Sequence, residues 1–218
     1  VEMELRHKNH RAALGLVRRA TGVGEGGGEG GDEGADALHP TTATGRRLTA
    51  EQERALPVQA RLHRSQRLWA LAADLEESLG TLESASAAYE RAMALRVATP
   101  QLVLNYAAML CEHKRWEAAF RAYERGVSSL FKFPHSADLW TAYLEAFVGR
   151  YGGSKLERAR DLFETCLKDC PAEACRPYYE AYARLEQAHG LARRAMDVYE
   201  RALAAVPKDQ RGAVVDLY

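Results

Sequence analysis

The stretch "AAFRAYERGV" at residues 118–127 has two close counterparts in the same chain, "ASAAYERAMA" at 85–94 and "RAMDVYERAL" at 194–203. A fourth copy, "LERARDLFET" at 156–165, has phenylalanine where the others have tyrosine. Aligned on this aromatic residue, successive copies are 34, 40 and 36 residues apart. Recurrence at such spacings is typical of repeat proteins, in which each copy is one small structural unit.

Small side chains flank each aromatic ring at helical spacing. An alanine stands four positions before the ring, and another small residue stands three positions after it. Because these positions share one face of a helix, each copy presents a large ring between two notches where a neighbouring helix can approach closely. We therefore assign the motif a packing role. Its positions are Ala85, Tyr89 and Ala92; Ala119, Tyr123 and Gly126; Ala159, Phe163 and Cys166; and Ala195, Tyr199 and Ala202.

A second apolar series lies upstream of each copy. Its members are three residues apart: Trp69 and Ala72, Val103 and Tyr106, Trp140 and Tyr143, and Tyr179 and Tyr182. Residues at this spacing share a helix face, so each repeat is predicted to contain two helices. The expected helices lie near 67–79, 82–96, 101–113, 115–130, 136–149, 155–169, 174–188 and 190–205.

A proline follows the second helix of every predicted pair. These residues are Pro100, Pro134, Pro171 and Pro207. Proline lacks the backbone donor that a helix needs and clashes with the preceding turn. We therefore expect each of these prolines to end the helix before it.

One pair of helices cannot bury both of its faces, so successive pairs must stack side by side. The sequence thus predicts an all-α fold, a right-handed α-solenoid of helix pairs. The period varies, and the first helices lack the Gly-aromatic signature of tetratricopeptide repeats. The Trp-x-x-Tyr opening and the Tyr-Glu-Arg-Ala centre instead resemble HAT repeats, the half-a-TPR units of RNA-processing scaffolds.

The repeats are expected at both ends of the chain. Residues 67–218 hold about four HAT repeats and the start of the next, on the pattern described above. Residues 1–21 fit the end of one more repeat, with Ala13, Val17 and Ala20 in the notch, ring and notch positions.

The segment between these two regions has a different composition. Residues 22–46 are rich in glycine and lack periodic apolar residues, which predicts a flexible insert. Within it, "GVGEGG" at 22–27 matches the letters of a dinucleotide-binding loop. That loop requires a preceding strand, and here a helix precedes it, so a low-complexity linker is favoured. Residues 47–66 are predicted to form a connecting segment.

Charge and composition exclude several classes of function. Lys plus Arg and Asp plus Glu each number 30, so no net field draws the chain to nucleic acid or to an anionic membrane. No run of residues approaches the ~18–20 apolar residues of a membrane-spanning helix. We expect no membrane association and no small-molecule substrate.

The candidate chemical groups do not form a site. Cys166, Cys170 and Cys175 lack the C-x-x-C spacing and the nearby histidine of a zinc site, so reduced thiols are expected. Glu90, Glu124 and Glu200 recur once per repeat beside the ring, which favours a structural ion pair or a solvated face. Because no nucleophile, base and orienting group occur together, we predict no catalytic residues, no cofactor, no metal and no enzymatic activity.

Nucleic-acid binding is the stronger alternative. Arg150, Lys155, Arg158 and Arg160 form a basic series that could meet a phosphate backbone, although Glu157 and Asp161 interrupt it. Two hypotheses therefore remain: a protein-binding scaffold, and an RNA-contacting HAT solenoid of another complex, such as that for mRNA 3'-end cleavage.

Longer stretches of the sequence resemble one particular family of HAT-repeat proteins. "ADLEESLGT", "YERG" and "RYGGSKLERARDLFE" are similar to the C-terminal HAT repeats of the SYF-type pre-mRNA splicing factors, also called XPA-binding HAT proteins. The likeness covers Trp69 to Tyr218, and "EMELRHKNHRAALGLVRRAT" resembles the repeat upstream.

This family resemblance has functional implications. It implies a nuclear, non-catalytic scaffold of the spliceosome, associated with the Prp-nineteen-related complex, with other spliceosomal proteins as partners. Those partners include crooked-neck-like HAT proteins, and RNA contact is secondary. In animals the family is also linked to transcription-coupled repair.

Overall fold

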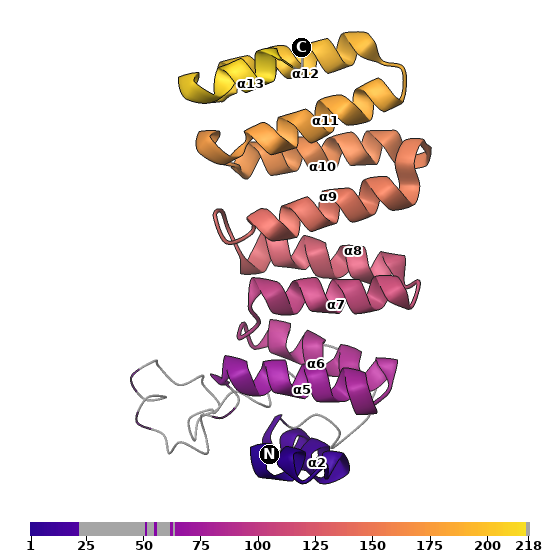
Figure 1. Cartoon of the computed structure of the whole chain (residues 1–218), viewed down its shortest axis with the longest axis vertical. Coiled ribbons are helices and arrows are strands. Elements are labelled where there is room, and N and C mark those ends of the chain that lie inside the picture. The colour runs from indigo at the N-terminus through magenta and orange to yellow at the C-terminus, as the bar shows by residue number, and fades with distance from the viewer. Residues whose placement is uncertain (22–50, 52–54, 56–61, 63, 217–218) are drawn as a thin grey trace, which may run out of the picture. The chain divides into compact units, whose positions relative to one another are not determined.

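The structure is a computed structural model that describes residues 1–21, 51, 55, 62 and 64–216 (Figure 1). Within these residues the regular structure is entirely helical, which confirms the predicted all-α class. The predicted insert at 22–46, with its "GVGEGG" stretch, and most of the connecting segment at 47–66 lie outside the described residues. The chain divides into two compact units, Val1–Met109 and Leu110–Tyr218, with the boundary inside helix α7.

The first unit contains four described helices and most of a fifth. They are α1 (Glu2–Arg6), α2 (His10–Thr21), α5 (Gln66–Leu79), α6 (Leu82–Ala94) and α7 (Pro100–Glu112). Helix α2 packs on α5, and α5 packs on α6. The core between α2 and α5 is formed by Ala13, Leu14, Val17, Ala72 and Leu75.

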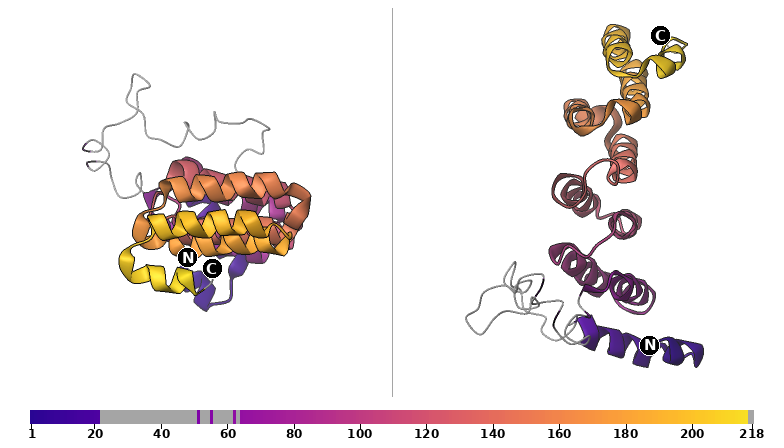
Figure 2. Two further views of the ribbon diagram at one scale, coloured as in Figure 1. Left: turned by 90° about the horizontal axis from the view of Figure 1, so that it is seen from above. Right: turned by 90° about the vertical axis from the view of Figure 1, so that its left-hand side faces the viewer.

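The second unit continues the alternation of long helices and short turns. Its elements are α8 (Trp116–Arg125), which runs into a π-helical turn at Gly126–Leu130, α9 (Ala137–Tyr151), α10 (Leu156–Asp169), α11 (Arg176–Ala188), α12 (Ala192–Ala205) and α13 (Arg211–Val215). Helix α9 packs on α8 and α10, and α11 packs on α10 and α12. In the right-hand view of Figure 2, α9 and α11 lie on one side of this unit, with α8 and α10 on the other.

Local sequence explains where the helices begin and end. Ser65 and Thr81 cap the N-termini of α5 and α6, and Thr81 forms a reciprocal capping box with Ser84. The turns after α9 and α11 contain Gly152 and Gly190 with φ of 45° and 73°, a backbone region that glycine enters at little cost.

The prolines behave differently from one another. Pro171 and Pro207 closely follow α10 and α12, which end at Asp169 and Ala205, as predicted. Pro100 does not end a helix, because α6 already stops at Ala94 and Pro100 is the first residue of α7. Proline is favoured at this position because backbone N–H groups in the first turn of a helix have no partner within the helix, so the N–H that proline lacks is not missed.

The aromatic residues of the repeat lie flat against one another in three places. In each, a ring from the second helix of one predicted pair stacks on a ring from the first helix of the next. The ring centroids are 4.9 Å apart for Tyr89 and Tyr106, 5.4 Å for Tyr123 and Tyr143, and 5.1 Å for Phe163 and Tyr182. Offset stacking adds to the free energy gained from burying each ring.

The positions assigned to rings and notches are buried throughout the described repeats. They are Trp69, Ala85, Tyr89, Ala92, Tyr106, Ala119, Tyr123, Gly126, Trp140, Tyr143, Ala159, Phe163, Cys166, Tyr182, Ala195, Tyr199 and Ala202. The predicted repeat at the N-terminus departs from this pattern at one position. Ala20 is only half-buried, and its neighbour Thr21 is buried instead, donating its hydroxyl to the Val17 carbonyl.

Candidate protein-binding surface

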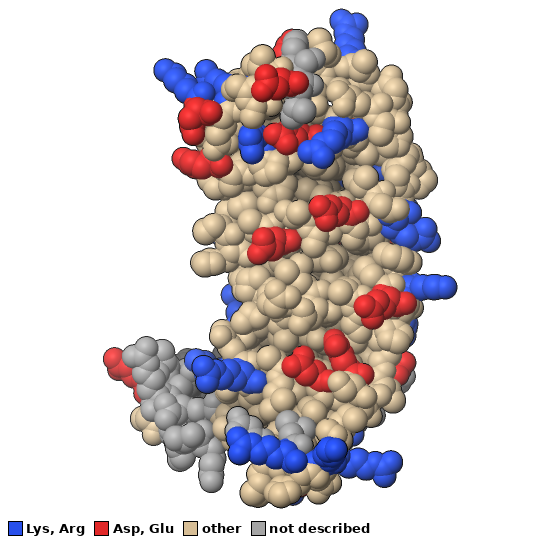
Figure 3. Space-filling model, in the orientation of Figure 1, with Lys and Arg blue, Asp and Glu red and all other residues tan. Residues whose placement is uncertain are grey.

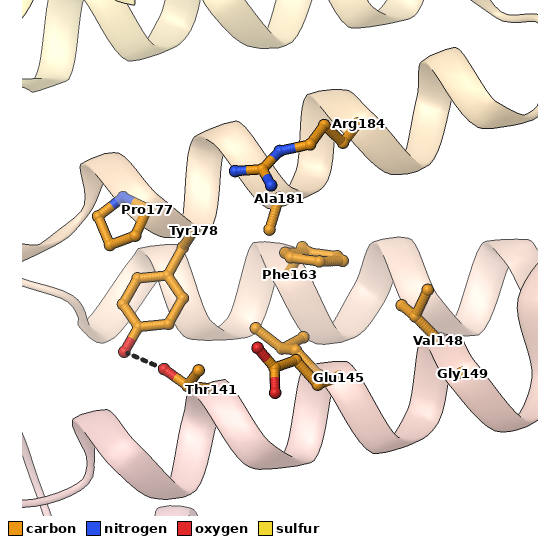
Figure 4. A pocket seen from close by; sticks show the side chains of 10 residues that line it. Thr141, Glu145, Val148, Gly149, Phe163, Pro177, Tyr178, Ala181 and Arg184 are labelled. Carbon is orange, nitrogen blue, oxygen red and sulfur yellow. Dashed lines mark hydrogen bonds between the residues drawn. The ribbon is translucent and has the colours of Figure 1, made fainter. Parts of the chain in front are cut away.

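A groove lies between α9 and α11 of the second unit (Figure 4). Its volume is about 480 Å³. One wall is the part of α9 from Thr141 to Gly149, and the other is the part of α11 from Pro177 to Arg184. Phe163 of α10 lies between the two walls, and its ring is held in place by the stack on Tyr182.

Small residues keep the groove open. Gly149 and Ala181 stand on opposite walls, where longer side chains would fill the space. A Cβ atom added at Gly149 would meet no other atom within 4 Å. The remaining lining is largely apolar and includes Leu144 and Val148 of α9 and Phe163 of α10. Such a surface attracts other apolar groups because their contact removes both from water.

One end of the groove is fastened by hydrogen bonds between its walls. The hydroxyl of Tyr178 donates to the carbonyl of Ala137 over 3.0 Å, and the Thr141 hydroxyl lies 3.5 Å from the Tyr178 oxygen. Burial raises the pKa of Tyr178 to about 12, so the phenol keeps its proton at neutral pH. Beyond this point a second cavity of about 550 Å³ shares Thr141, Pro177 and Tyr178 and extends to Gln210.

The two walls differ in charge. On α11, the carboxylate of Glu180 lies 3.5 Å from Arg184 and 3.6 Å from Arg176. On α9, Glu145 lines the groove and makes no ion pair with any residue between 64 and 216. Figure 3 shows the same contrast, since acidic side chains stand apart from basic ones along most of α9 and the two signs adjoin over α11.

The predicted basic series is engaged within the protein. Arg160 is buried, and its guanidinium donates two hydrogen bonds of 2.6 and 2.7 Å to the carboxylate of Glu186. The expectation that Arg160 could face a phosphate backbone is therefore wrong. Its neighbours are also occupied: Lys155 and Arg158 each lie 3.7 Å from a carboxylate, of Glu117 and Glu124 respectively.

Arg150, the remaining member of the basic series, packs against aromatic rings. Its guanidinium carbon lies 5.5 Å from the ring centres of both Trp116 and Tyr151. The Tyr151 hydroxyl in turn donates to Glu117 over 2.6 Å. This cluster is a surface network of cation–π contacts and hydrogen bonds, and it leaves no cation of the series without a partner in the chain.

The three thiols of the zinc hypothesis are buried or half-buried and weakly acidic. Cys166 is buried in its notch, Cys175 donates to the carbonyl of Ala172 over 3.1 Å, and burial raises the pKa of Cys170 to about 12. Such thiols are poor nucleophiles because little thiolate is present at neutral pH. In the parts of the chain that the structure describes, no three His, Cys, Asp or Glu residues are placed to hold a metal ion.

The recurring glutamates contact neighbouring elements of the repeat. Glu90 accepts a hydrogen bond of 3.1 Å from the hydroxyl of Tyr106, and Glu124 pairs with Arg158. Glu200 is exposed on α12. These placements distribute the carboxylates along the molecule, where general acid–base catalysis would need them together.

The periodicity did not predict that two carboxylates of the repeats are buried. Glu76 and Glu186 are each about 1% exposed, and each forms a two-pronged ion pair with an arginine. A signal was present, because both stand seven residues after the aromatic that begins the upstream apolar series of their helix, Trp69 or Tyr179. That spacing places a charged residue on the buried face of the helix, where it requires a partner.

The comparisons with known proteins identify the family. A family model described as "Pre-mRNA-splicing factor Syf1/CRNKL1 C-terminal HAT repeat" matches residues 1–218. The chain belongs to this HAT-repeat family. The resemblance found in the sequence is thereby confirmed, and the helices described above are those of a HAT-repeat solenoid.

Relatives of this HAT-repeat chain occur in animals and fungi. It is 47% identical over 217 residues to the pre-mRNA-splicing factor syf1 homolog of Drosophila melanogaster and to pre-mRNA-splicing factor SYF1 of Homo sapiens. It is 39% identical over 216 residues to pre-mRNA-splicing factor cwf3 of Schizosaccharomyces pombe. These matches cover 99–100% of the chain but only 22–25% of each relative.

A helix that crosses a bilayer must be both long and apolar. None of the helices in the described parts of the chain combines the length and the apolar character that a membrane span needs.

Proposed function

We propose that the chain is a non-catalytic scaffold of the spliceosome that acts in pre-mRNA splicing, in the nucleus, by binding other proteins. The observation that carries this proposal is the match over nearly the whole chain to relatives named pre-mRNA-splicing factors, at 39–47% identity from fission yeast to human. A solenoid of helix pairs suits such a role, because its stacked helices offer extended surfaces to several partners at fixed spacing.

The absence of enzymatic activity is part of the proposal. The polar residues that recur in the repeats take part in packing, as in the hydrogen bond from Tyr89 to Glu77 and the ion pair between Arg160 and Glu186. Catalysis would need a nucleophile, a base and an orienting group in mutual contact. The groove between α9 and α11 supplies apolar surface and two separated charges, which suit recognition.

The proposed partners are other spliceosomal proteins, including crooked-neck-like HAT proteins, within the Prp-nineteen-related complex. The sequence resemblance supports these partners, as it does a further role in transcription-coupled repair. We also propose the division into one repeat end at 1–21 and about four repeats with the start of the next at 67–218. The second part accords with the helices α5 to α13.

RNA binding is the weaker proposal for physical reasons. Sequence-independent RNA contact depends on cations that are free to neutralise phosphates. Of the basic series at 150–160, Arg160 is buried, Lys155 and Arg158 face carboxylates, and Arg150 packs on aromatic rings.

The proposal can be tested by affinity purification from nuclear extract. The tagged chain is recovered with and without prior digestion of all nucleic acid, and the proteins bound to it are identified. We expect splicing proteins to remain bound after digestion, because the contacts are between proteins. Loss of those proteins on digestion would instead support the RNA-contacting alternative.

A further inference from the structure

We propose that the groove between α9 and α11 is the docking site for an amphipathic helix of a partner protein. This helix would lay its apolar face over Phe163 and place a lysine or arginine beside Glu145. The inference rests on the proposed function, since it takes the partner to be a protein. It goes further in naming the surface used and the chemistry of the segment that fits it.

The dimensions of the groove suit a short helix. The wall on α9 runs from Thr141 to Gly149, and the eight steps between these residues, at ~1.5 Å each, span about 12 Å, or about two turns of a partner helix. A helix of that length presents three or four residues at i, i+3, i+4 and i+7 on one face. A volume of about 480 Å³ accepts the side chains of such a face. Helix-in-groove recognition uses this arrangement of anchors.

The walls allow the backbone of the partner to come close. The distance between two packed helices is set by the side chains where they touch. Gly149 and Ala181 keep these side chains short on both walls, and the ring of Phe163 lies between the walls. An extended peptide would gain less here, because strand addition needs the edge of a sheet and the described residues form none.

The charges of the two walls select the sign of the partner. The single carboxylate of Glu180 lies 3.5 Å from Arg184 and 3.6 Å from Arg176, so the α11 wall keeps a net positive charge. On the opposite wall Glu145 is negative and forms no ion pair with any residue between 64 and 216. A basic residue of the partner would form an ion pair with Glu145, and an acidic residue at that place would be repelled by it. Complementary charge of this kind adds specificity to a surface whose affinity comes from apolar contact.

Gly149 provides a way to close the groove without disturbing the fold. A Cβ atom at this position meets nothing within 4 Å, so the leucine of Gly149→Leu has room to project into the groove that Gly149 lines. Replacing an exposed helical glycine also favours the helix by up to ~1 kcal/mol. The matched control is Gly15→Leu in α2, another helical glycine with open space around it. Both variants should melt no lower than the parent chain.

The experiment places a photo-crosslinking amino acid at Ala181, on the wall opposite Gly149. The full chain is irradiated in nuclear extract, and the crosslinked segment is mapped by mass spectrometry. We expect one protein segment with large apolar residues at helical spacing and a lysine or arginine next to them. Gly149→Leu should reduce the crosslink about tenfold or more, Glu145→Lys should reduce it several-fold, and Gly15→Leu should leave it unchanged.

Several results would overturn the proposal. They are a crosslink to RNA, to a second copy of this chain or to an acidic or non-helical segment, and a crosslink that Gly149→Leu leaves intact. A yield no greater than that from a crosslinker at Ala204, an exposed position on α12, would do the same.

The failure of this inference can be separated from failure of the proposed function. If Gly149→Leu keeps its nuclease-resistant splicing proteins while no partner crosslinks in the groove, the scaffold role stands and the docking site is wrong. If the parent chain itself loses those proteins on nuclease digestion, the scaffold role is wrong.

Discussion

The contact between α2 and α5 in the first unit and the contact between α10 and α11 in the second solve the same packing problem. In each, the second helix of one pair meets the first helix of the next, and an arginine reaches a glutamate buried on that first helix. Arg18 bonds to Glu76 at 2.6 and 2.7 Å, and Arg160 bonds to Glu186 at the same two distances. The glutamates occupy equivalent positions, seven residues after Trp69 and Tyr179.

The two contacts differ in what surrounds the ion pair. Between α10 and α11 the rings of Phe163 and Tyr182 stack, and the Arg160 side chain is 9% exposed. Between α2 and α5 the equivalent positions are Val17 and Ala72, and the Arg18 side chain is 39% exposed. Smaller apolar residues therefore leave the ion pair of the first unit more open to solvent.

The polar partners differ as well. Glu76 accepts an additional hydrogen bond of 2.7 Å from the Ser84 hydroxyl, so in the first pair the carboxylate has a second partner. In the second pair Arg160 also donates to Glu157, so here the guanidinium has a second partner. Successive helix pairs can therefore meet around a buried glutamate in both units, whereas the aromatic stack and the position of the arginine vary.

The largest expected effect is at the more buried pair. Arg160→Ala should lower the free energy of unfolding by about 3–5 kcal/mol, because it leaves Glu186 buried without its partner. Urea unfolding followed by circular dichroism measures this change. The double variant Arg160→Met with Glu186→Leu removes both charges and should recover most of the loss. A double variant as unstable as Arg160→Ala would show that the charge of Glu186 is not the cause.

Because the apolar residues at the two contacts differ in size, truncating them should lower the free energy of unfolding by unequal amounts. Phe163→Ala should cost about 3–5 kcal/mol through the cavity and the lost stack, whereas Val17→Ala should cost about 1.5–2 kcal/mol for two methyl groups. Both are measured by urea unfolding under the same conditions. Equal losses would mean that the stack contributes no more than the smaller cluster.

The ion pair between Arg18 and Glu76 should make the first unit less stable at low pH. Bonds from Arg18 and Ser84 hold the pKa of Glu76 below its usual value of 4.5, although burial opposes them. A lowered folded-state pKa gives stability that is complete above pH ~4.5 and is lost as pH falls through the folded-state value. Fluorescence of Trp69, buried in α5, should report unfolding in less urea at pH 3 than at pH 6. Arg18→Met should flatten this dependence, and an unchanged profile would contradict the role of the pair.

The smallest effect is expected at an exposed pair with the same geometry. Arg201 bonds to Glu164 through two contacts of 2.7 Å, but both side chains are about half exposed. Solvent screening limits such pairs, so Arg201→Ala should cost about 0.5–1 kcal/mol. A loss as large as that of Arg160→Ala would show that burial does not set the strength of these pairs.

The sequence predicted the parts of the fold that repeat. Ring and notch positions such as Tyr123 and Ala119 recur, so their periodicity shows which face is buried, and the helix bounds followed to within a few residues. The predicted helix at 115–130 did not anticipate the π-helical turn at Gly126–Leu130, because backbone hydrogen-bond registers leave no clear pattern in side chains.

The candidate site was harder to find from sequence. Arg160 and Glu186 are 26 residues apart, and Arg18 and Glu76 are 58 apart, so their pairing depends on how helices stack. The groove depends in the same way on residues such as Gly149 and Ala181, which look ordinary on their own helices. Periodicity shows which residues are buried, whereas tertiary packing decides which polar residues meet.

The most direct test of a protein-binding role over an RNA-binding role is the salt dependence of RNA affinity. Binding of the chain to single-stranded RNA is measured from low to physiological salt and plotted as log K against log salt. Because the basic series at 150–160 is engaged within the protein, we expect weak binding with a slope shallower than about −1, equivalent to fewer than two phosphates neutralised. Tight binding with a slope of about −3 or steeper would contradict this and assign the chain to the RNA-contacting class.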